Sequence, residues 1–228
     1  ERSAFPIYGN VISFLRKNYQ LQATPSLVMR PPFMNESMMQ QLGKGDQFQI
    51  TRSPDQNQFS IVSATRTFRS AIIPFKTKDG VTSFQFLQDT LQKIGITSSI
   101  QFSARKPAGN LLYSIPTDSL LKPLMHRSDN FFAEQSLLMV SQRVLNRMNE
   151  EQLIDTLLKT DFADLPQQPR WADGSGLSRY NLFSPQDFVR ILEKMKDQFG
   201  MDRIKVIFPT GGEGTLASYY KQDSGSIY

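Results

Sequence analysis

The chain contains a ten-residue stretch, HRSDNFFAEQ at residues 126–135, which leads into an apolar-periodic segment that runs to about Met148. Ser128, Asp129 and Asn130 stand where this periodicity predicts that a helix begins. A serine there can relay a proton between a nucleophile, a base and a leaving amine, and an asparagine can hold a substrate carbonyl and orient a lysine. The same residue types are favoured helix N-caps, and a bare S-D-N is more often a cap than a catalytic motif.

Two further motifs follow, WADGSGLSRYN at residues 171–181 and FPTGGEGTL at residues 208–216. With S-D-N-x-x-A-E they resemble the peptidase S13 family of low-molecular-mass penicillin-binding proteins, which are D-alanyl-D-alanine carboxypeptidases and endopeptidases. In that family, segments of the type S-D-N-x-x-A-E, D-G-S-G-L-S-R and G-x-x-G-T-L follow in this order. The match covers about Ser114 to Tyr228, and three motifs together are far more specific than one.

The resemblance implies an α+β fold in which a small strand-rich inserted domain precedes the helical part of a β-lactamase/transpeptidase-like domain. It implies a serine-type enzyme of the periplasm that acts on peptidoglycan stem peptides through an acyl-enzyme, is inhibited by β-lactams when intact, and needs no cofactor or metal. Ser128 would relay the proton to the leaving D-alanine, and Asn130 would anchor the substrate amide and the lysine. The residues that would line the substrate site are Asp129, Ser175, Gly176 and Leu177, with Leu177 facing the ligand.

The loop that starts at Asp173 also has a purely structural interpretation. Two glycines and an aspartate supply positive φ angles at little cost, so D-G-S-G by itself is typical of a tight turn. Asp129 is likewise expected to support the turn before its helix.

The nucleophile is harder to find, because the family signature also includes S-x-x-K and K-T-G. Three S-x-x-K matches start at Ser103, Ser119 and Ser218. Ser103 precedes a Lys-Pro-Ala-Gly breaker, Ser218 lies among tyrosines after a glycine-rich loop, and Ser119 is too close to Ser128 to form a separate wall of a cleft. We interpret all three as incidental matches.

No K-T-G strand is recognised, since Thr210-Gly211 follows a proline rather than a lysine. We therefore expect an interior segment of a longer enzyme, with its nucleophile before Glu1 and its K-T-G strand after Tyr228. A catalytically inert cell-wall-binding or scaffolding module is the alternative. The parent reading frame would distinguish the two.

Composition indicates a folded protein of one large or two small domains, since 39% of its 228 residues are hydrophobic and 21% are charged. No run of eighteen apolar residues predicts a transmembrane segment. The absence of cysteine excludes a disulfide framework, a thiolate metal site and a cysteine nucleophile.

The net charge of +5 is unevenly distributed, with +7 in residues 1–108 and −2 in residues 109–228. A basic first half could bind a polyanion such as nucleic acid, an anionic membrane or an acidic wall polymer. Its basic residues are scattered rather than blocked, which favours an ordinary solvated surface and no nucleic-acid partner.

Residues 1–108 are predicted to form a strand-rich domain with one helix, and residues 109–228 a mostly helical domain, with the boundary placed in 103–110. The expected strands are Val11–Leu15, Leu27–Met29, Phe48–Arg52, Phe59–Ser63, Arg69–Phe75 and Ile96–Phe102. The expected helices are Thr82–Ile94, Thr117–Met125 with a break or bend at Pro123, a buried Asp129–Asn149, Glu151–Lys159 and Gln186–Phe199. Residues 208–220 are expected to be loop followed by strand or irregular structure.

Other site chemistries have little support. His126 is the only histidine, and a triad of His126, Ser128 and Asp173 is less favoured than a structural histidine. No His/carboxylate cluster has metal-ligand spacing. The glycines at 211–214 lack the Lys-Ser/Thr of a phosphate-binding loop and therefore predict a turn.

Overall fold

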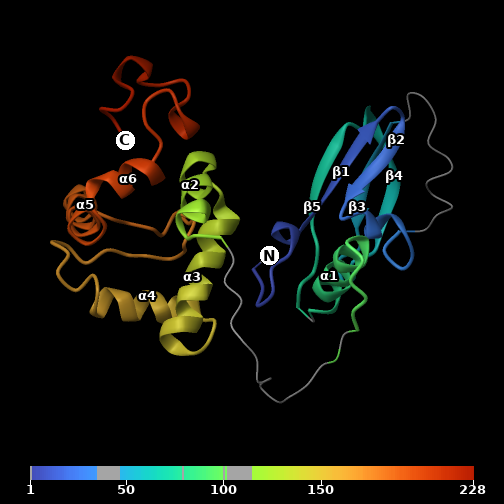
Figure 1. Cartoon of the computed structure of the whole chain (residues 1–228), viewed down its shortest axis with the longest axis horizontal. Coiled ribbons are helices and arrows are strands. Elements are labelled where there is room, and N and C mark those ends of the chain that lie inside the picture. Colours follow the sequence, from blue (N-terminus) through green and yellow to red (C-terminus); the bar gives the residue numbers. More distant parts are fainter. Residues whose placement is uncertain (1, 35–46, 79, 100, 102–114) are drawn as a thin grey trace. The chain divides into compact units, whose positions relative to one another are not determined.

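The protein is described by a computed structural model that covers residues 2–34, 47–78, 80–99, 101 and 115–228 (Figure 1). The chain divides into two compact units, Glu1–Pro107 and Ala108–Tyr228. The first holds antiparallel strands and one helix, and the second is helical, so the expected α+β class is confirmed. The predicted domain boundary in 103–110 lies outside the described residues.

The first unit contains, in its described residues, two small antiparallel sheets and one helix. One sheet has the order β2-β1-β5, with β1 at Val11–Lys17, β2 at Gln20–Thr24 and β5 at Ser70–Pro74. The other pairs β3, Gln47–Arg52, with β4, Phe59–Thr67. The helix is α1, Val81–Lys93, and short 3-10 turns span Tyr8–Asn10 and Ser26–Met29.

Phenylalanine dominates the core of this unit. Alternate residues of β1 face inward, so Ile12 and Phe14 are buried while their neighbours are more exposed. Phe86 of α1 is 0% exposed and meets Phe75 edge to face, with ring centroids 5.2 Å apart. Phe14 contacts Phe59 with centroids 5.4 Å apart. These rings join both sheets and the helix into one hydrophobic cluster.

Most of the predicted elements in this unit are confirmed, but two predicted strands are wrong and one strand was not predicted. Leu27–Met29 lies in the 3-10 turn Ser26–Met29, which starts after Pro25, and not in a strand. Residues 96–99 form no strand, no described strand pairs with them, and Ile96 is 48% exposed. The sequence did not predict β2, whose inward side consists only of Leu21 and Ala23.

The described part of the second unit, residues 115–228, contains five helices and short turns. The helices are α2 Asp118–Arg127, α3 Asn130–Leu145, α4 Glu150–Lys159, α5 Pro185–Phe199 and α6 Met201–Ile207, followed by the 3-10 turns η4 Gly214–Leu216 and η5 Lys221–Asp223. Its small core joins α3 and α4 through Leu137, Leu153 and Ile154, with Trp171 packed against it. Helices α4 and α5 were predicted within one residue. Helix α6 was not predicted.

Polar links position these helices. Ser184 and Asp187 form a reciprocal capping box at the start of α5. Asp187 is 0% exposed and also accepts a hydrogen bond from the Gln167 N–H at 3.0 Å. Burial raises the pKa of Asp187, but the N–H and hydroxyl donors outweigh it, so the pKa lies below its ordinary value. Arg203 of α6 pairs with Asp118 of α2 at 2.7 Å.

Two expectations about the central helices need correction. Helix α2 is not interrupted at Pro123 and extends to Arg127, two residues beyond the expected end. Helix α3 ends at Leu145 and not at Asn149, because Asn146 adopts a left-handed conformation and the buried Ser141 hydroxyl accepts from the Asn149 N–H at 2.9 Å. The side of α3 that carries Val140 and Val144, 43% and 52% exposed, is not buried among the described residues.

We predict that Phe86→Ala lowers the free energy of unfolding of the first unit by about 3–5 kcal/mol, because it leaves a cavity among the rings. Ile94→Ala is the control, since Ile94 follows the same helix but is 68% exposed, and we expect a change below about 0.5 kcal/mol. Urea unfolding of the 228-residue chain measures both. Equal effects of the two variants would contradict the ring cluster as the core.

Candidate active site

The first motif forms the junction between α2 and α3. Ser128 ends α2 in the left-handed conformation, with φ 52° and ψ 53°. Asp129 is the N-cap of α3, and its Oδ1 accepts from the Phe132 N–H at 3.1 Å. Asn130 is the first residue of α3. The capping interpretation of S-D-N therefore holds for Asp129 and is wrong for Ser128 and Asn130.

Ser128 and Asn130 have exposed side chains that hydrogen-bond no other described residue. Neither side chain is needed for the local fold in the way that Asp129 is. A left-handed conformation costs a serine about 1–3 kcal/mol relative to an ordinary one, and such strain concentrates at functional positions. The junction thus leaves a hydroxyl and a carboxamide exposed.

The second motif is folded around the carboxylate of Asp173. Asp173 Oδ1 accepts from the Gly176 N–H at 2.7 Å and from Asn181 Nδ2 at 2.8 Å. Asp173 Oδ2 accepts from the Ser178 N–H at 2.7 Å. These bonds connect Asp173, at the start of the loop, to residues in its middle and at its end. Asp173 is therefore a structural residue of the loop, and His126 hydrogen-bonds neither it nor Ser128, so the described geometry contains no triad.

The second motif is attached directly to the first. Glu134 of α3 accepts hydrogen bonds on Oε1 from the Ser175 hydroxyl at 2.7 Å and from the Ser175 N–H at 3.2 Å. Gly174 lies so close to α3 that a Cβ on it would be 2.9 Å from the Ala133 carbonyl oxygen. Only glycine permits this approach. Ala133 and Glu134 of the first motif therefore contact Gly174 and Ser175 of the second motif.

The third motif lies against the end of α2. A Cβ on Gly214 would be 2.9 Å from both the Cα and the carbonyl oxygen of His126, two residues before Ser128. Upstream in the same loop, the buried Thr210 hydroxyl donates to the Ile227 carbonyl at 2.7 Å and accepts from the Gly225 N–H at 2.7 Å. All three motifs thus meet around the α2–α3 junction.

The proposed substrate residues differ in their surroundings. The Ser175 hydroxyl already donates to Glu134, whereas Gly176 is exposed and Leu177 is 70% exposed. Beside this loop is a mostly apolar hollow of about 740 Å³, lined among others by Gly174, Gly176, Trp171, Phe183 and Phe188. Glu134 and Gly214 were not among the predicted site residues. A carboxylate within an apolar-periodic helix was the signal that could have identified Glu134.

Among the described residues, the serines of the S-x-x-K matches are poor candidates for the nucleophile. Ser119 and Lys122 lie in the first turns of α2 with exposed side chains that make no hydrogen bond to each other. Ser218 is exposed in the turn after η4, and Ser103 lies outside the described residues. The described part of the chain contains no group of three or more His, Asp or Glu side chains placed to hold a metal. No described helix has the length and apolar character to cross a membrane.

Comparison with known proteins agrees with the arrangement of the motifs. The model of the D-Ala-D-Ala carboxypeptidase 3 (S13) family matches residues 31–226. The chain belongs to this S13 family. The D-alanyl-D-alanine carboxypeptidase DacB of Haemophilus influenzae is 29% identical over 144 residues, which is 58% of this chain and 30% of that protein.

Solved structures show the same fold. The crystal structure of penicillin-binding protein 4 from Haemophilus influenzae matches with a TM-score of 0.63 and 20% identity over 99% of this chain and 53% of that one. A second structure of that protein, complexed with a novel β-lactam, matches with a TM-score of 0.61, 23% identity, and 99% and 56% coverage. This S13 chain thus spans about half the length of the solved relatives.

We predict that Glu134→Ala lowers the free energy of unfolding of the second unit by about 1–3 kcal/mol, because two donors of Ser175 lose their acceptor. Glu134→Gln keeps one acceptor oxygen and should cost less. Glu151→Ala on the exposed side of α4 is the control and should cost below about 0.5 kcal/mol. Urea unfolding and amide hydrogen exchange at Ser175 measure the effect. Unchanged exchange at Ser175 in Glu134→Ala would contradict the contact.

Proposed function

We propose that this chain is part of a serine-type D-Ala-D-Ala carboxypeptidase or endopeptidase that acts on peptidoglycan stem peptides in the periplasm through an acyl-enzyme. The observation that carries the proposal is the convergence of three family motifs around Ser128 and Asn130, which have no structural task of their own. Membership of the S13 family supports the reaction class.

Each side chain has a role that follows from its chemistry. When the D-Ala-D-Ala amide is cleaved, the leaving amine must gain a proton. The Ser128 hydroxyl both donates and accepts, so it can pass a proton to that amine from the base. The Asn130 carboxamide can donate to a substrate carbonyl with its NH₂ group and accept from a lysine ammonium with its oxygen. Neither residue acts as the nucleophile.

The loop at residues 173–178 forms a wall of the proposed cleft. Its backbone is fixed by Asp173 and by the contact with Glu134, while Leu177 remains exposed for a ligand. Fixed loop geometry favours catalysis, because a substrate held in the right orientation loses less entropy at the reaction step. In this proposal Gly176 and Leu177 contact the stem peptide, and Ser175 and Asp129 hold the wall and the helix in place.

The nucleophilic serine, its lysine and the K-T-G strand are proposed to come from parts of the protein outside these 228 residues. The solved relatives are about twice as long as the segment that matches. In the intact enzyme a β-lactam would acylate that serine, and no cofactor or metal is required by this chemistry.

The 228-residue chain alone should form no covalent adduct with a fluorescent penicillin. Ser119 and Ser218 are exposed and lack the geometry of an activated nucleophile, and the sequence after Ser103 is a Lys-Pro-Ala-Gly breaker. Labelling that survives denaturation is the measurement, with the intact protein as positive control. An adduct mapped to Ser103, Ser119 or Ser218 would show that the nucleophile lies within this chain.

In the intact protein, Ser128→Ala should slow penicillin acylation by about 10²–10⁴-fold, the usual contribution of one positioned acid or base group. Asn130→Ala should slow it similarly and raise KM more, because the carboxamide would bind both ground and transition states. Neither change removes a helix cap, so melting temperatures should stay close to wild type.

Ser136→Ala in the same helix is the matched control and should acylate at the wild-type rate. Asp129→Ala is the opposite control, because it removes the cap and should cost about 1 kcal/mol of stability. Wild-type acylation by Ser128→Ala would refute its relay role. No acylation of the intact wild-type protein by penicillin would favour an inert wall-binding or scaffolding module.

A further inference from the structure

A second candidate binding site lies in the first unit, between the β3–β4 turn and the segment that joins β5 to α1. The two segments border a hollow of about 770 Å³, a volume that suits a small ligand. Its hydrogen-bonding residues come from the turn (Gln56, Asn57 and Gln58), from the segment after β5 (Lys76 and Lys78) and from α1 (Gln85).

Hydrogen bonds from two side chains fix the walls of this hollow. Asn57 Nδ2 donates to the Lys76 carbonyl and to the Thr82 hydroxyl at 2.8 Å each, and Asn57 Oδ1 accepts from the Lys76 N–H at 2.6 Å. Arg52 Nε at the end of β3 donates to the Pro74 carbonyl at 2.9 Å. The turn is therefore held against the β5–α1 segment without a ligand, and a preformed site loses less entropy on binding.

The side chains around the hollow have unused hydrogen-bonding capacity. The carboxamides of Gln56, Gln58 and Gln85 hydrogen-bond no other described residue, and neither do the ammonium groups of Lys76 and Lys78. Each carboxamide offers two donors and an acceptor, and each ammonium offers three donors. A ligand that fits must therefore supply acceptors and donors close together.

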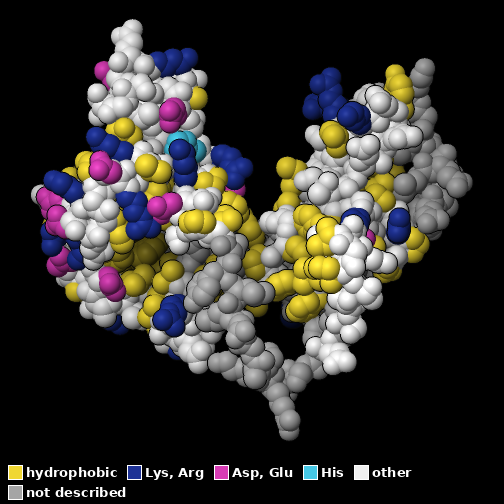
Figure 2. Space-filling model, viewed as in Figure 1, with side chains coloured by type: hydrophobic (Ala, Val, Ile, Leu, Met, Phe, Trp, Pro, Cys, Tyr) yellow, Lys and Arg dark blue, Asp and Glu magenta, His cyan; other side chains and the backbone are white. Residues whose placement is uncertain are grey.

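The lining of the hollow is mainly polar. Among its described residues only Pro32 and Phe33 are apolar, and Phe33 is buried. A peptide with apolar side chains therefore has little to pack against. Asp55 lines the hollow together with the two lysines, so charges of both signs are present. On the face shown in Figure 2, the Lys and Arg side chains of the first unit lie in separate groups and not in the continuous stripe that a nucleic acid would follow.

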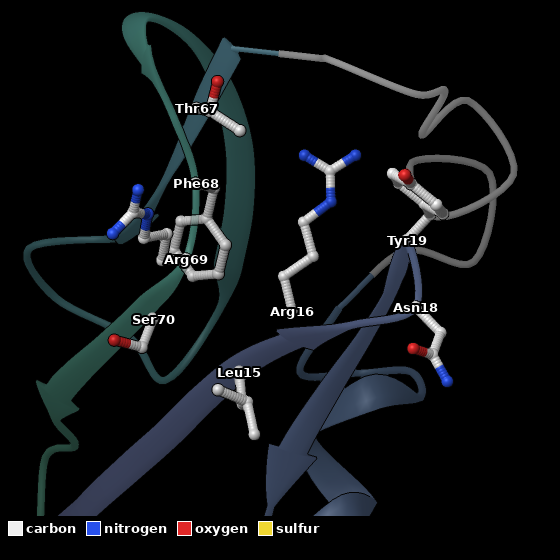
Figure 3. A pocket seen from close by; sticks show the side chains of 8 residues that line it. All are labelled: Leu15, Arg16, Asn18, Tyr19, Thr67, Phe68, Arg69 and Ser70. Carbon is white, nitrogen blue, oxygen red and sulfur yellow. The ribbon is translucent and has the colours of Figure 1, made fainter.

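Another hollow of this unit is different. It has a volume of about 830 Å³ and lies at the β1–β2 turn beside Arg16 and Tyr19 (Figure 3). Both residues already take part in interactions, among them the contact of the Arg16 guanidinium with the Tyr19 ring, 6.0 Å from carbon to ring centre. This second hollow therefore serves as an internal reference in the experiment.

We propose that the hollow beside Gln58 and Lys76 binds a carbohydrate chain that carries acetamido groups. Neighbouring hydroxyl groups of a sugar both donate and accept, so one glutamine carboxamide can pair with two of them. The acetamido carbonyl is an acceptor for the ammonium of Lys76 or Lys78. The site is separate from the proposed catalytic function, because all its residues belong to the first unit, and the failure of either proposal leaves the other standing.

The test is a titration of the ¹⁵N-labelled 228-residue chain with tri-N-acetylchitotriose, an uncharged sugar that is rich in acetamido groups. We expect saturable shifts of the side-chain NH₂ signals of Gln56, Gln58 and Gln85, and none of the backbone signals of Asn18 and Ser70 in the reference hollow. The affinity should stay constant as salt is added, because the ligand carries no charge. Cellotriose, which has hydroxyl in place of acetamido groups, should bind at least about threefold more weakly.

Two glutamine variants locate the site. Gln58→Ala and Gln85→Ala should each weaken binding by about two- to tenfold, the contribution of one hydrogen-bonding group. Neither carboxamide has a partner among the described residues, so melting temperatures should stay close to wild type. Gln20→Ala in β2 is the matched control, because it removes an exposed carboxamide that does not line the hollow. Its affinity should match wild type within about twofold.

Each of three results would overturn the proposal. Equal binding of cellotriose would show that acetamido groups are not recognised. Unchanged affinity in both glutamine variants, or shifts confined to other residues, would place the binding elsewhere. Acetyl-Ala-Gln-Gln-Ala-amide that produces the same shifts at the same concentration would assign the hollow to a peptide.

Discussion

The contact between α3 and the 173–178 loop is the constraint on which the candidate active site depends. Glu134 accepts from both donors of Ser175, and Gly174 brings the loop backbone against Ala133. Asp173 fixes the inner geometry of the loop. Because of these bonds, two motifs about forty residues apart in the chain behave as one rigid element. Ser128 and Asn130 then occupy a defined place at the start of the helix to which the loop is attached.

The two units achieve stability in different ways. The first buries a continuous cluster of phenylalanine rings, so burial of apolar surface is its main favourable contribution. The second has a small apolar core and leaves Phe188, Val189 and Leu192 about half exposed among the described residues. Its helices are therefore placed largely by specific polar links, such as the buried Asp187 and the pair of Asp118 with Arg203. Polar links are directional, which suits a unit that must hold side chains in fixed positions.

Sequence patterns predicted those elements that have strong local signals. The helices at 81–93 and 185–199 carry apolar periodicity and clear boundaries, and four strands carry alternating or continuous apolar residues. The failures have local causes too. Strand β2 has only two inward residues, and residues 96–99 contain a single apolar residue and have no pairing partner in the described structure. The meeting of the motifs could be expected only through the family resemblance, because the Glu134–Ser175 and Gly214–His126 contacts join residues far apart in sequence.

Gly214 packs closely on the backbone of His126, so a substitution at position 214 would affect the candidate active site. Position 214 carries no chemical group of its own, yet any side chain there would press on the backbone two residues before Ser128. The loop and the helix end must therefore move together, and a displacement of one is transmitted to the other as a rigid shift. Under the proposed function, variation at this glycine would change the placement of the Ser128 hydroxyl. It would resemble an active-site mutation in its effect although it lies outside the reacting groups.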